Sequence, residues 1–252
     1  MTARTDKPGR SRRRTLLRIL LGVLFALTLG IAVYAGDYYR ADETALACLE
    51  EPLPGVEVER QGSRMVFKPR QARAGLIFYP GGKVEYTAYA PLMVKLAEEG
   101  ILCVLVKMPL NLAVLNPSAA AGIREAFPDV EVWAIGGHSL GGVMAARYAA
   151  EHPQEFNALV LLASYAASDI RQSGTRVLSV YGTHDGVLKW DQYEKCRGNL
   201  PADLTEQAIE GGCHAGFGSY GPQKGDGMPG ISAVEQQEEA AALIVQFLLP
   251  KP

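Results

Sequence analysis

Apolar residues occur along most of this chain in short runs, separated by segments with helical spacing. The runs predict strands at residues 65–68, 76–79, 101–106, 132–135, 158–162, 176–181 and 205–209. The segments between and after them predict helices at 89–99, 119–126, 140–150, 191–199 and 234–249. Strands that are apolar throughout, rather than alternating, are expected to be covered on both faces of the sheet.

The alternation of strands with helices defines a fold class. Such chains form a parallel sheet covered by helices, so we predict an α/β fold with a doubly wound, mostly parallel sheet. Ligands of these sheets bind at the carboxyl ends of the strands. The residues that directly follow each strand are therefore the candidates for chemistry.

A longer apolar run precedes the sheet pattern. Ile19–Gly36 contains 18 residues without a charge, which as a helix would span about 27 Å, close to the thickness of a bilayer core. We expect a transmembrane signal anchor at 16–36. A cleaved signal peptide is the alternative, since Val33-Tyr34-Ala35 fits a cleavage site. A buried core helix is a third interpretation, although the run is apolar all the way round.

The anchor implies a division of the chain into four parts. We expect a basic cytoplasmic tail at 1–15, the anchor at 16–36, a juxtamembrane stalk at 37–60 and the folded domain at 61–252. Basic residues directly before an apolar run favour a cytoplasmic N-terminus. The prediction is a single-pass protein of the cell membrane with its domain on the extracytoplasmic side.

Charge narrows the range of partners. The whole chain has 25 basic and 27 acidic residues, of which residues 1–36 hold seven basic ones and Asp6. The remainder therefore has 18 basic and 26 acidic residues, a net charge of −8. Nucleic-acid binding needs a basic surface, so we expect no nucleic-acid partner.

The strand at 132–135 is followed by Gly137-His138-Ser139-Leu140-Gly141, which matches the pattern G-x-S-x-G. The pattern alone is weak, but it requires a strand before the serine and a helix after it, and both are predicted. A serine on so sharp a turn needs neighbours without side chains. We expect Ser139 to be a nucleophile. A helix N-cap in a glycine-rich helix start is the alternative.

Two further strand ends supply an acid and a base. Asp185 follows the strand at 176–181, and His214 lies in a glycine-rich loop after the strand at 205–209. The chain order Ser139, Asp185, His214 is that of a catalytic triad on a sheet of this kind. For Asp185, capping of the next helix is an equally simple interpretation.

The loop after the strand at 76–79 is a candidate oxyanion site. Its sequence, Pro80-Gly81-Gly82-Lys83, allows a sharp turn that exposes backbone N–H groups. We expect the backbone N–H of Leu140, with one from Gly82 or Lys83, to hold an oxyanion. An ordinary turn is the alternative.

Together these motifs resemble the α/β-hydrolase superfamily, and most of all the alpha/beta hydrolase fold-5 family, which is related to dienelactone-hydrolase-like enzymes. The resemblance extends from Asp37 to the C-terminus and rests on residues 78–83, 108–112, 137–142, 181–186 and 214–221. It implies a serine hydrolase that cleaves acyl bonds, chiefly carboxylic esters, with Ser139 as nucleophile, Asp185 as acid, His214 as base and no cofactor. Relatives often carry a small polar residue in place of Cys213.

Substrate features are less specific. The segment after the strand at 158–162 is too short for a large lid, so we expect an open site for small-molecule or lipid-like acyl substrates. Tyr86 and Tyr220 are candidates to line the pocket, or are ordinary surface tyrosines. The loop at 219–229, which contains Asp226, forms one wall of the site or is a flexible surface loop.

Cysteine spacing and alternative functions complete the predictions. Cys103 is expected to be a buried thiol, and Cys196 could pair with Cys213. No cysteine spacing resembles a zinc site, so no metal is expected. An acyltransferase that uses the same triad and a non-catalytic binding protein on a hydrolase fold are the alternatives to a hydrolase.

Overall fold

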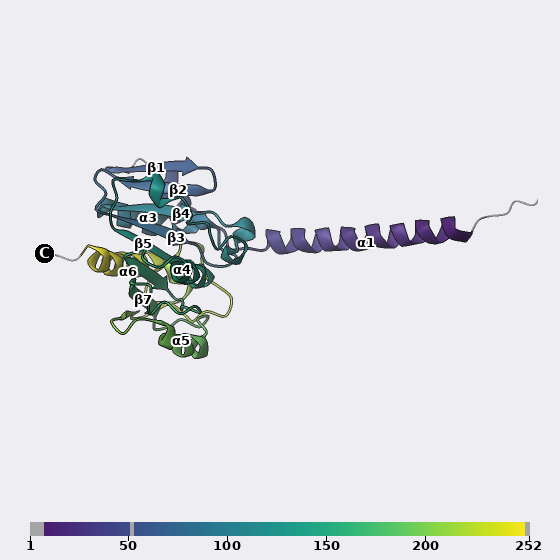
Figure 1. Cartoon of the computed structure of the whole chain (residues 1–252). Coiled ribbons are helices and arrows are strands. Elements are labelled where there is room, and N and C mark those ends of the chain that lie inside the picture. The colour runs from purple at the N-terminus through teal and green to yellow at the C-terminus, as the bar shows by residue number, and fades with distance from the viewer. Residues whose placement is uncertain (1–7, 51–52, 250–252) are drawn as a thin grey trace, which may run out of the picture. The chain divides into compact units, whose positions relative to one another are not determined.

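The computed structural model describes residues 8–50 and 53–249, and the chain divides into two units, Met1–Tyr38 and Tyr39–Pro252. The first unit contains helix α1, Pro8–Gly36, drawn in purple in Figure 1. Its stretch Arg14–Gly36 is 23 residues long, apolar and unburied, which is sufficient by length and composition to cross a membrane. Residues 1–7 of the predicted basic tail lie outside the described residues.

The second unit is built on one sheet, which has eight strands in the described residues, in the order β1-β2-β4-β3-β5-β6-β7-β8. The strands are β1 (Val56–Gln61), β2 (Arg64–Pro69), β3 (Ala74–Tyr79), β4 (Ile101–Val106), β5 (Trp133–His138), β6 (Ala158–Leu162), β7 (Arg176–Gly182) and β8 (Thr205–Ile209). β2 pairs antiparallel with β1 and β4, and the other neighbours are parallel. This confirms the predicted mostly parallel α/β sheet.

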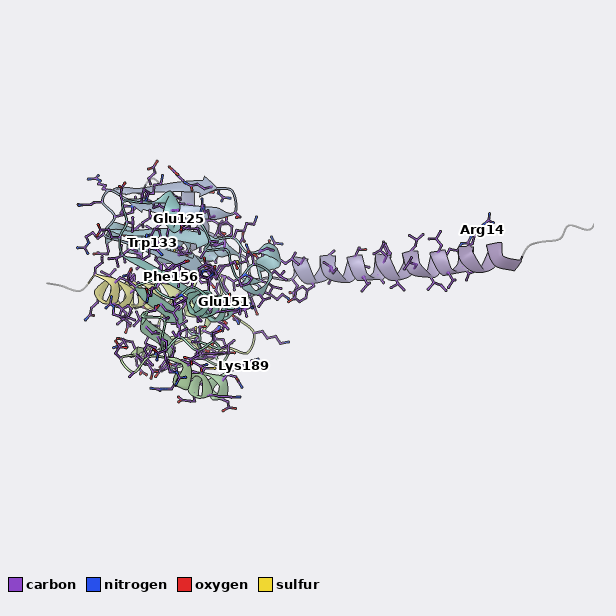
Figure 2. The ribbon with its side chains drawn as sticks, viewed as in Figure 1. Arg14, Glu125, Trp133, Glu151, Phe156 and Lys189 are labelled. Carbon is purple, nitrogen blue, oxygen red and sulfur yellow. The ribbon has the colours of Figure 1, made fainter. Side chains whose placement is uncertain are left out.

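Helices cover both faces of the sheet (Figure 1). The α-helices of this unit are α2 (Glu43–Glu50), α3 (Ala90–Glu98), α4 (Leu140–Glu151), α5 (Trp190–Cys196) and α6 (Ala233–Leu248). Alternate residues of the strands enter two separate cores, one shared with α3 and α6 and the other with α4. Trp133 and Phe156, labelled in Figure 2, are buried in the α4 core. Burial on both faces explains why β3, β4 and β6 are apolar throughout.

The structure differs from the sequence-based prediction in two segments. Part of the expected stalk at 37–60 is folded into the domain, because it contains α2 and the edge strand β1. β1 escaped detection because an edge strand buries little, and its charged side chains mask the apolar pattern. The helix expected at 119–126 is instead a series of turns with one short 3₁₀ turn, Arg124–Ala126, because Gly122 has φ +72°.

Candidate active site

Ser139 lies at the junction between β5 and α4, where the chain turns sharply. Its φ is 51° and ψ −124°, a conformation that L-residues rarely adopt. The turn is held at both ends, since the Ser139 N–H donates to the Leu162 carbonyl at 2.9 Å and the Ser164 hydroxyl donates to the Ser139 carbonyl at 2.7 Å. The Ser139 side chain makes no helix-capping hydrogen bond, which argues against the N-cap interpretation.

The glycines around Ser139 are required by close packing. A Cβ atom on Gly141 would overlap the Tyr79 carbonyl oxygen, and one on Gly137 would lie 2.6 Å from the backbone carbon of Gly141. Both separations are too short for two atoms that are not bonded to each other. The glycines therefore allow β5, α4 and the end of β3 to meet at the serine.

Asp185 and His214 form a buried pair. His214 Nδ1 and Asp185 Oδ2 are 2.8 Å apart, and their side chains are 2% and 0% exposed. The other carboxylate oxygen of Asp185 accepts the backbone N–H groups of Val187 and Leu188 at 2.8 and 2.7 Å. Asp185 therefore bonds the turn that precedes α5, but it does not cap that helix, whose N-cap is Lys189 without a side-chain hydrogen bond. With Nδ1 directed to a carboxylate, Nε2 is the nitrogen left to accept a proton.

The position of His214 relative to the serine follows from its neighbours. The His214 ring lies 4.6 Å, centroid to centroid, from the ring of His138, which directly precedes Ser139. Ser139 Oγ and His214 form no hydrogen bond within the described part of the chain. Such bonds between nucleophile and base are often long in the absence of substrate. The carboxyl ends of β5, β7 and β8 thus bring the three predicted residues to one edge of the sheet.

The candidate oxyanion donors are reduced to two. The Lys83 N–H donates to the Asn111 carbonyl at 2.7 Å, so Lys83 is not available as a donor and this expectation is corrected. The N–H groups of Gly82 and of Leu140, the first residue of α4, have no hydrogen-bond partner among the described residues. Gly82 packs against Leu140, since a Cβ on it would lie 3.0 Å from Leu140 Cδ2.

Tyr89 forms a hydrogen bond with the loop that contains Gly81 and Gly82, a role that the sequence did not reveal. The Gly81 N–H donates to the buried Tyr89 hydroxyl at 3.0 Å, and this hydroxyl lies 2.8 Å from His138 Nδ1. Burial lowers the pKa of His138 well below its usual value, and the nearby His214 adds to the effect. A neutral His138 can accept a hydrogen bond from the Tyr89 hydroxyl at Nδ1. The hydroxyl oxygen is then oriented to accept the hydrogen bond from the Gly81 N–H.

Asp226 is a second residue whose role the sequence did not reveal. Its carboxylate accepts four backbone N–H groups, from Gly186 at 3.1 Å, His214 at 3.1 Å, Ala215 at 2.8 Å and Gly227 at 2.9 Å. Asp226 therefore joins the loop that carries Asp185 to the loop that carries His214. A lone aspartate in a glycine-rich loop gives no sequence signal for this.

Gln236 fixes the residue before His214. The buried amide of Gln236 receives the Cys213 N–H at 2.9 Å and donates to the Cys213 carbonyl at 2.8 Å. Burial, with Asp226 nearby, raises the pKa of the Cys213 thiol to about 11. Cys213 and Cys196 are both free thiols, as is the buried Cys103. No three His, Cys, Asp or Glu side chains of the described residues could hold a metal ion.

Tyr86 and Tyr220 are both buried rather than surface tyrosines. Tyr220 packs against Tyr39 and Tyr89, and its hydroxyl donates to Gln223 at 3.0 Å. The loop at 219–229 borders a mainly apolar hollow of about 490 Å³, whose lining includes neither Tyr86 nor Tyr220 and none of Ser139, Asp185 and His214. This hollow is lined by Asp42, Cys213, Ala215, Gly216, Gly218, Gly221, Pro222, Gln223, Asp226, Gly227, Met228, Pro229, Ile231 and Ala233.

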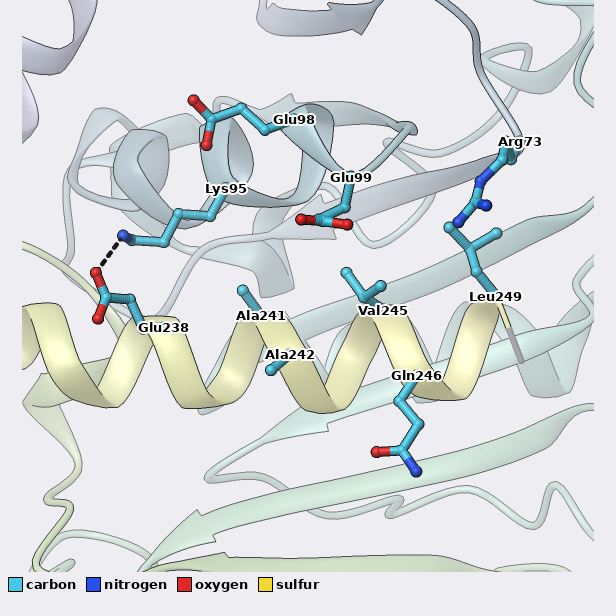
Figure 3. Close-up of a pocket in the computed structure, with 10 residues that line it drawn as sticks. All are labelled: Arg73, Lys95, Glu98, Glu99, Glu238, Ala241, Ala242, Val245, Gln246 and Leu249. Atoms are coloured by element: carbon cyan, nitrogen blue, oxygen red, sulfur yellow. Dashed lines mark hydrogen bonds and ion pairs between the residues drawn. The ribbon is translucent and has the colours of Figure 1, made fainter. Parts of the chain in front are cut away.

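A wider hollow of about 950 Å³ lies between α3 and α6, where Lys95 and Glu238 form an ion pair (Figure 3). Its lining includes Arg73, which directly precedes β3. The hollow is therefore at the amino ends of the parallel strands, the edge opposite to Ser139. Its lining contains no serine, threonine or cysteine, so it offers no hydroxyl or thiol nucleophile.

Comparison with known proteins agrees with the fold. The solved structure TT1662 from Thermus thermophilus has a TM-score of 0.58 at 14% identity, over 78% of this chain and 99% of that one. Est1E from Butyrivibrio proteoclasticus has a TM-score of 0.56 at 13% identity, over 78% and 100%. No curated protein matches the chain. A family model described as "Alpha/beta hydrolase family" matches residues 75–238. This chain belongs to the alpha/beta hydrolase family.

Proposed function

We propose that the protein is a serine hydrolase that cleaves carboxylic esters. The observation that carries the proposal is the buried 2.8 Å contact between Asp185 and His214 at the sheet edge where Ser139 occupies a strained turn. An aspartate–histidine pair activates a serine only when all three meet at one place. The name of the similar structure Est1E suggests an esterase, which supports the same chemistry.

The mechanism begins with proton transfer from Ser139 to Nε2 of His214 as the hydroxyl attacks the acyl carbon. Asp185 holds the imidazole in the required tautomer and stabilises its charged form. The backbone N–H groups of Gly82 and Leu140 hold the negative oxygen of the tetrahedral intermediate. His214 returns the proton to the leaving alcohol, and water then hydrolyses the acyl-enzyme.

We further propose that α1 is an uncleaved signal anchor in the cell membrane, with the domain on the extracytoplasmic side. The length and exposure of Arg14–Gly36 support a span. The seven basic residues in the first 36 support a cytoplasmic N-terminus. The substrate would then be a small-molecule or lipid-like acyl ester that is reached from outside the cytoplasm.

The test is the reaction of the full chain with a fluorophosphonate probe and with p-nitrophenyl butyrate. Ser139→Ala should abolish labelling and lower turnover by about 10⁴- to 10⁶-fold, because the covalent nucleophile is lost. Ser63→Ala is the matched control, since Ser63 is an exposed serine in the turn between β1 and β2. Labelling that persists in Ser139→Ala would place the nucleophile elsewhere and contradict the proposal.

The same assay separates hydrolysis from acyl transfer. With an added alcohol acceptor, a hydrolase releases mainly free acid, whereas an acyltransferase releases mainly a new ester. A folded wild-type chain that neither labels nor turns over any ester would instead support a binding protein on this fold.

A further inference from the structure

The segment Pro109–Leu115, which follows β4, presents apolar side chains to solvent. Leu110, Val114 and Leu115 are 45%, 47% and 51% exposed. Single exposed apolar residues are ordinary on protein surfaces. Three in one short segment require an explanation, because each loses favourable burial.

The backbone of this segment is held in an unusual conformation. Leu110 and Asn111 have φ values of 50° and 55°, in the left-handed region that non-glycine residues rarely occupy. Such conformations persist where the surroundings hold them. Here Asn111 is held through its carbonyl, which accepts the Lys83 N–H at 2.7 Å. The exposed position of Leu110 is thus built into the fold.

Contacts connect this segment to the nucleophile. Lys83, which bonds Asn111, follows Gly82, and Gly82 packs against Leu140 at the start of α4. Ser139 directly precedes Leu140. The exposed apolar side chains therefore form a rim beside the candidate oxyanion site.

The same loop receives the beginning of the domain. Tyr39 donates its N–H to the Lys83 carbonyl at 2.7 Å and accepts the Glu85 N–H at 2.8 Å. Tyr39 is three positions after Gly36, the last residue of α1, and three residues of chain reach at most about 11 Å. Whatever direction α1 takes, its end is tethered within that reach of Tyr39 and hence close to the loop that bonds Pro109–Leu115.

We propose that Pro109–Leu115 contacts the surface of the bilayer, and that the substrates are acyl esters of amphiphiles resident in that bilayer. This inference rests on the proposed function, because it takes α1 to be an anchor and Ser139 to be the nucleophile. The anchor keeps the segment at high local concentration beside the lipid, so few apolar side chains suffice for contact. A second copy of the chain fits less well, since three side chains fall far short of a stable protein interface.

The first test measures contact with lipid independently of activity. The full chain with Leu115→Trp is reconstituted in phosphatidylcholine vesicles, with and without brominated acyl chains that quench tryptophan. Val234→Trp is the matched control, because Val234 is 45% exposed at the start of α6. After subtraction of the signal from Trp133 and Trp190, the tryptophan at position 115 should lose at least half its emission and that at 234 almost none.

The second test compares two esters in the same vesicles. The variant Val114→Ser/Leu115→Ser should lower turnover of a vesicle-embedded long-chain umbelliferyl ester about tenfold, and turnover of soluble p-nitrophenyl butyrate less than twofold. The matched control is Val234→Ser, at a residue that is 45% exposed at the start of α6. It should change neither rate more than twofold.

The outcomes distinguish the inference from the function on which it rests. Equal quenching at 115 and 234, or equal loss of both esters in Val114→Ser/Leu115→Ser, overturns the lipid-contact inference while activity on butyrate stands. Blue-shifted emission at 115 that brominated lipid does not quench assigns the segment to a protein partner and also overturns it. Quenching at 115 without hydrolysis of either ester keeps the lipid contact and refutes the esterase.

Discussion

At the scale of single residues, the candidate site depends on side chains that bond the backbone of neighbouring loops. Asp226 is the clearest case, since it bonds the N–H groups beside both Asp185 and His214. Burial of its carboxyl opposes ionisation, but the N–H donors outweigh it, so the pKa of Asp226 lies below the usual 3.8. A lowered pKa means that the folded state favours the ionised carboxylate.

We therefore predict that Asp226→Ala lowers the free energy of unfolding at pH 7 by about 2 kcal/mol, because several backbone N–H groups lose their acceptor. A carboxyl with a lowered folded-state pKa stabilises the fold above about pH 4, and this contribution disappears as the pH falls through that pKa. The difference between wild type and variant should shrink between pH 4 and pH 2, as measured by urea unfolding. Asp129→Ala, at an exposed aspartate, is the control. A difference that is constant with pH would contradict the argument.

At the scale of secondary-structure elements, the start of α6 positions the loop that carries His214. A capping box between Ser232 and Glu235 fixes the first turn of this helix. Gln236, the next residue, is thereby directed at Cys213, whose N–H and carbonyl it bonds. Helix α6 therefore positions His214 by holding the backbone of Cys213, the residue before it.

We predict that Gln236→Ala lowers the free energy of unfolding by about 2–4 kcal/mol, because two buried backbone groups lose their partner. It should also lower kcat for p-nitrophenyl butyrate, since the His214 loop loses its anchor to α6. Gln246→Ala is the matched control, because Gln246 is an exposed glutamine of the same helix (Figure 3). Equal effects of the two substitutions, in urea unfolding and in kinetics, would show that the contact with Cys213 is unimportant.

At the scale of the whole molecule, the chain consists of two units, Met1–Tyr38 and Tyr39–Pro252. The unit from Tyr39 onward has its own two cores on the two faces of the sheet. The span Arg14–Gly36 buries none of its residues, so it contributes little to the stability of the domain.

Deletion of residues 1–36 should therefore release a folded domain from the membrane. We expect a Tm within about 2 °C of that of the full chain, because no core contact is removed, and unchanged turnover of p-nitrophenyl butyrate. Carbonate extraction of membranes should leave the full chain in the pellet and the deleted chain in the supernatant. A full chain that carbonate extracts would refute the anchor, and protease digestion of sealed cells reports the side of the domain.

The sequence by itself determined the class of fold and predicted the sheet edge at which we propose the chemistry. The strands at 101–106, 158–162 and 205–209 have the predicted bounds. In the first two, every residue is buried, so the two covered faces require apolar residues at every position. The turn at Ser139 could also be predicted, since its glycines satisfy a local steric demand. The order of Ser139, Asp185 and His214 predicted three side chains at strand ends, and in the structure they follow β5, β7 and β8, with β6 between the first two.

Only the tertiary structure decided how that edge is held together. The choice of Gly82 over Lys83 depends on Asn111, and the roles of Asp226 and Gln236 depend on loops that are distant in sequence. The strand β1 is likewise defined by its pairing with β2 rather than by its own pattern. Periodicity and turn chemistry act between near neighbours in the chain, whereas these hydrogen bonds join segments that meet only when the sheet has formed.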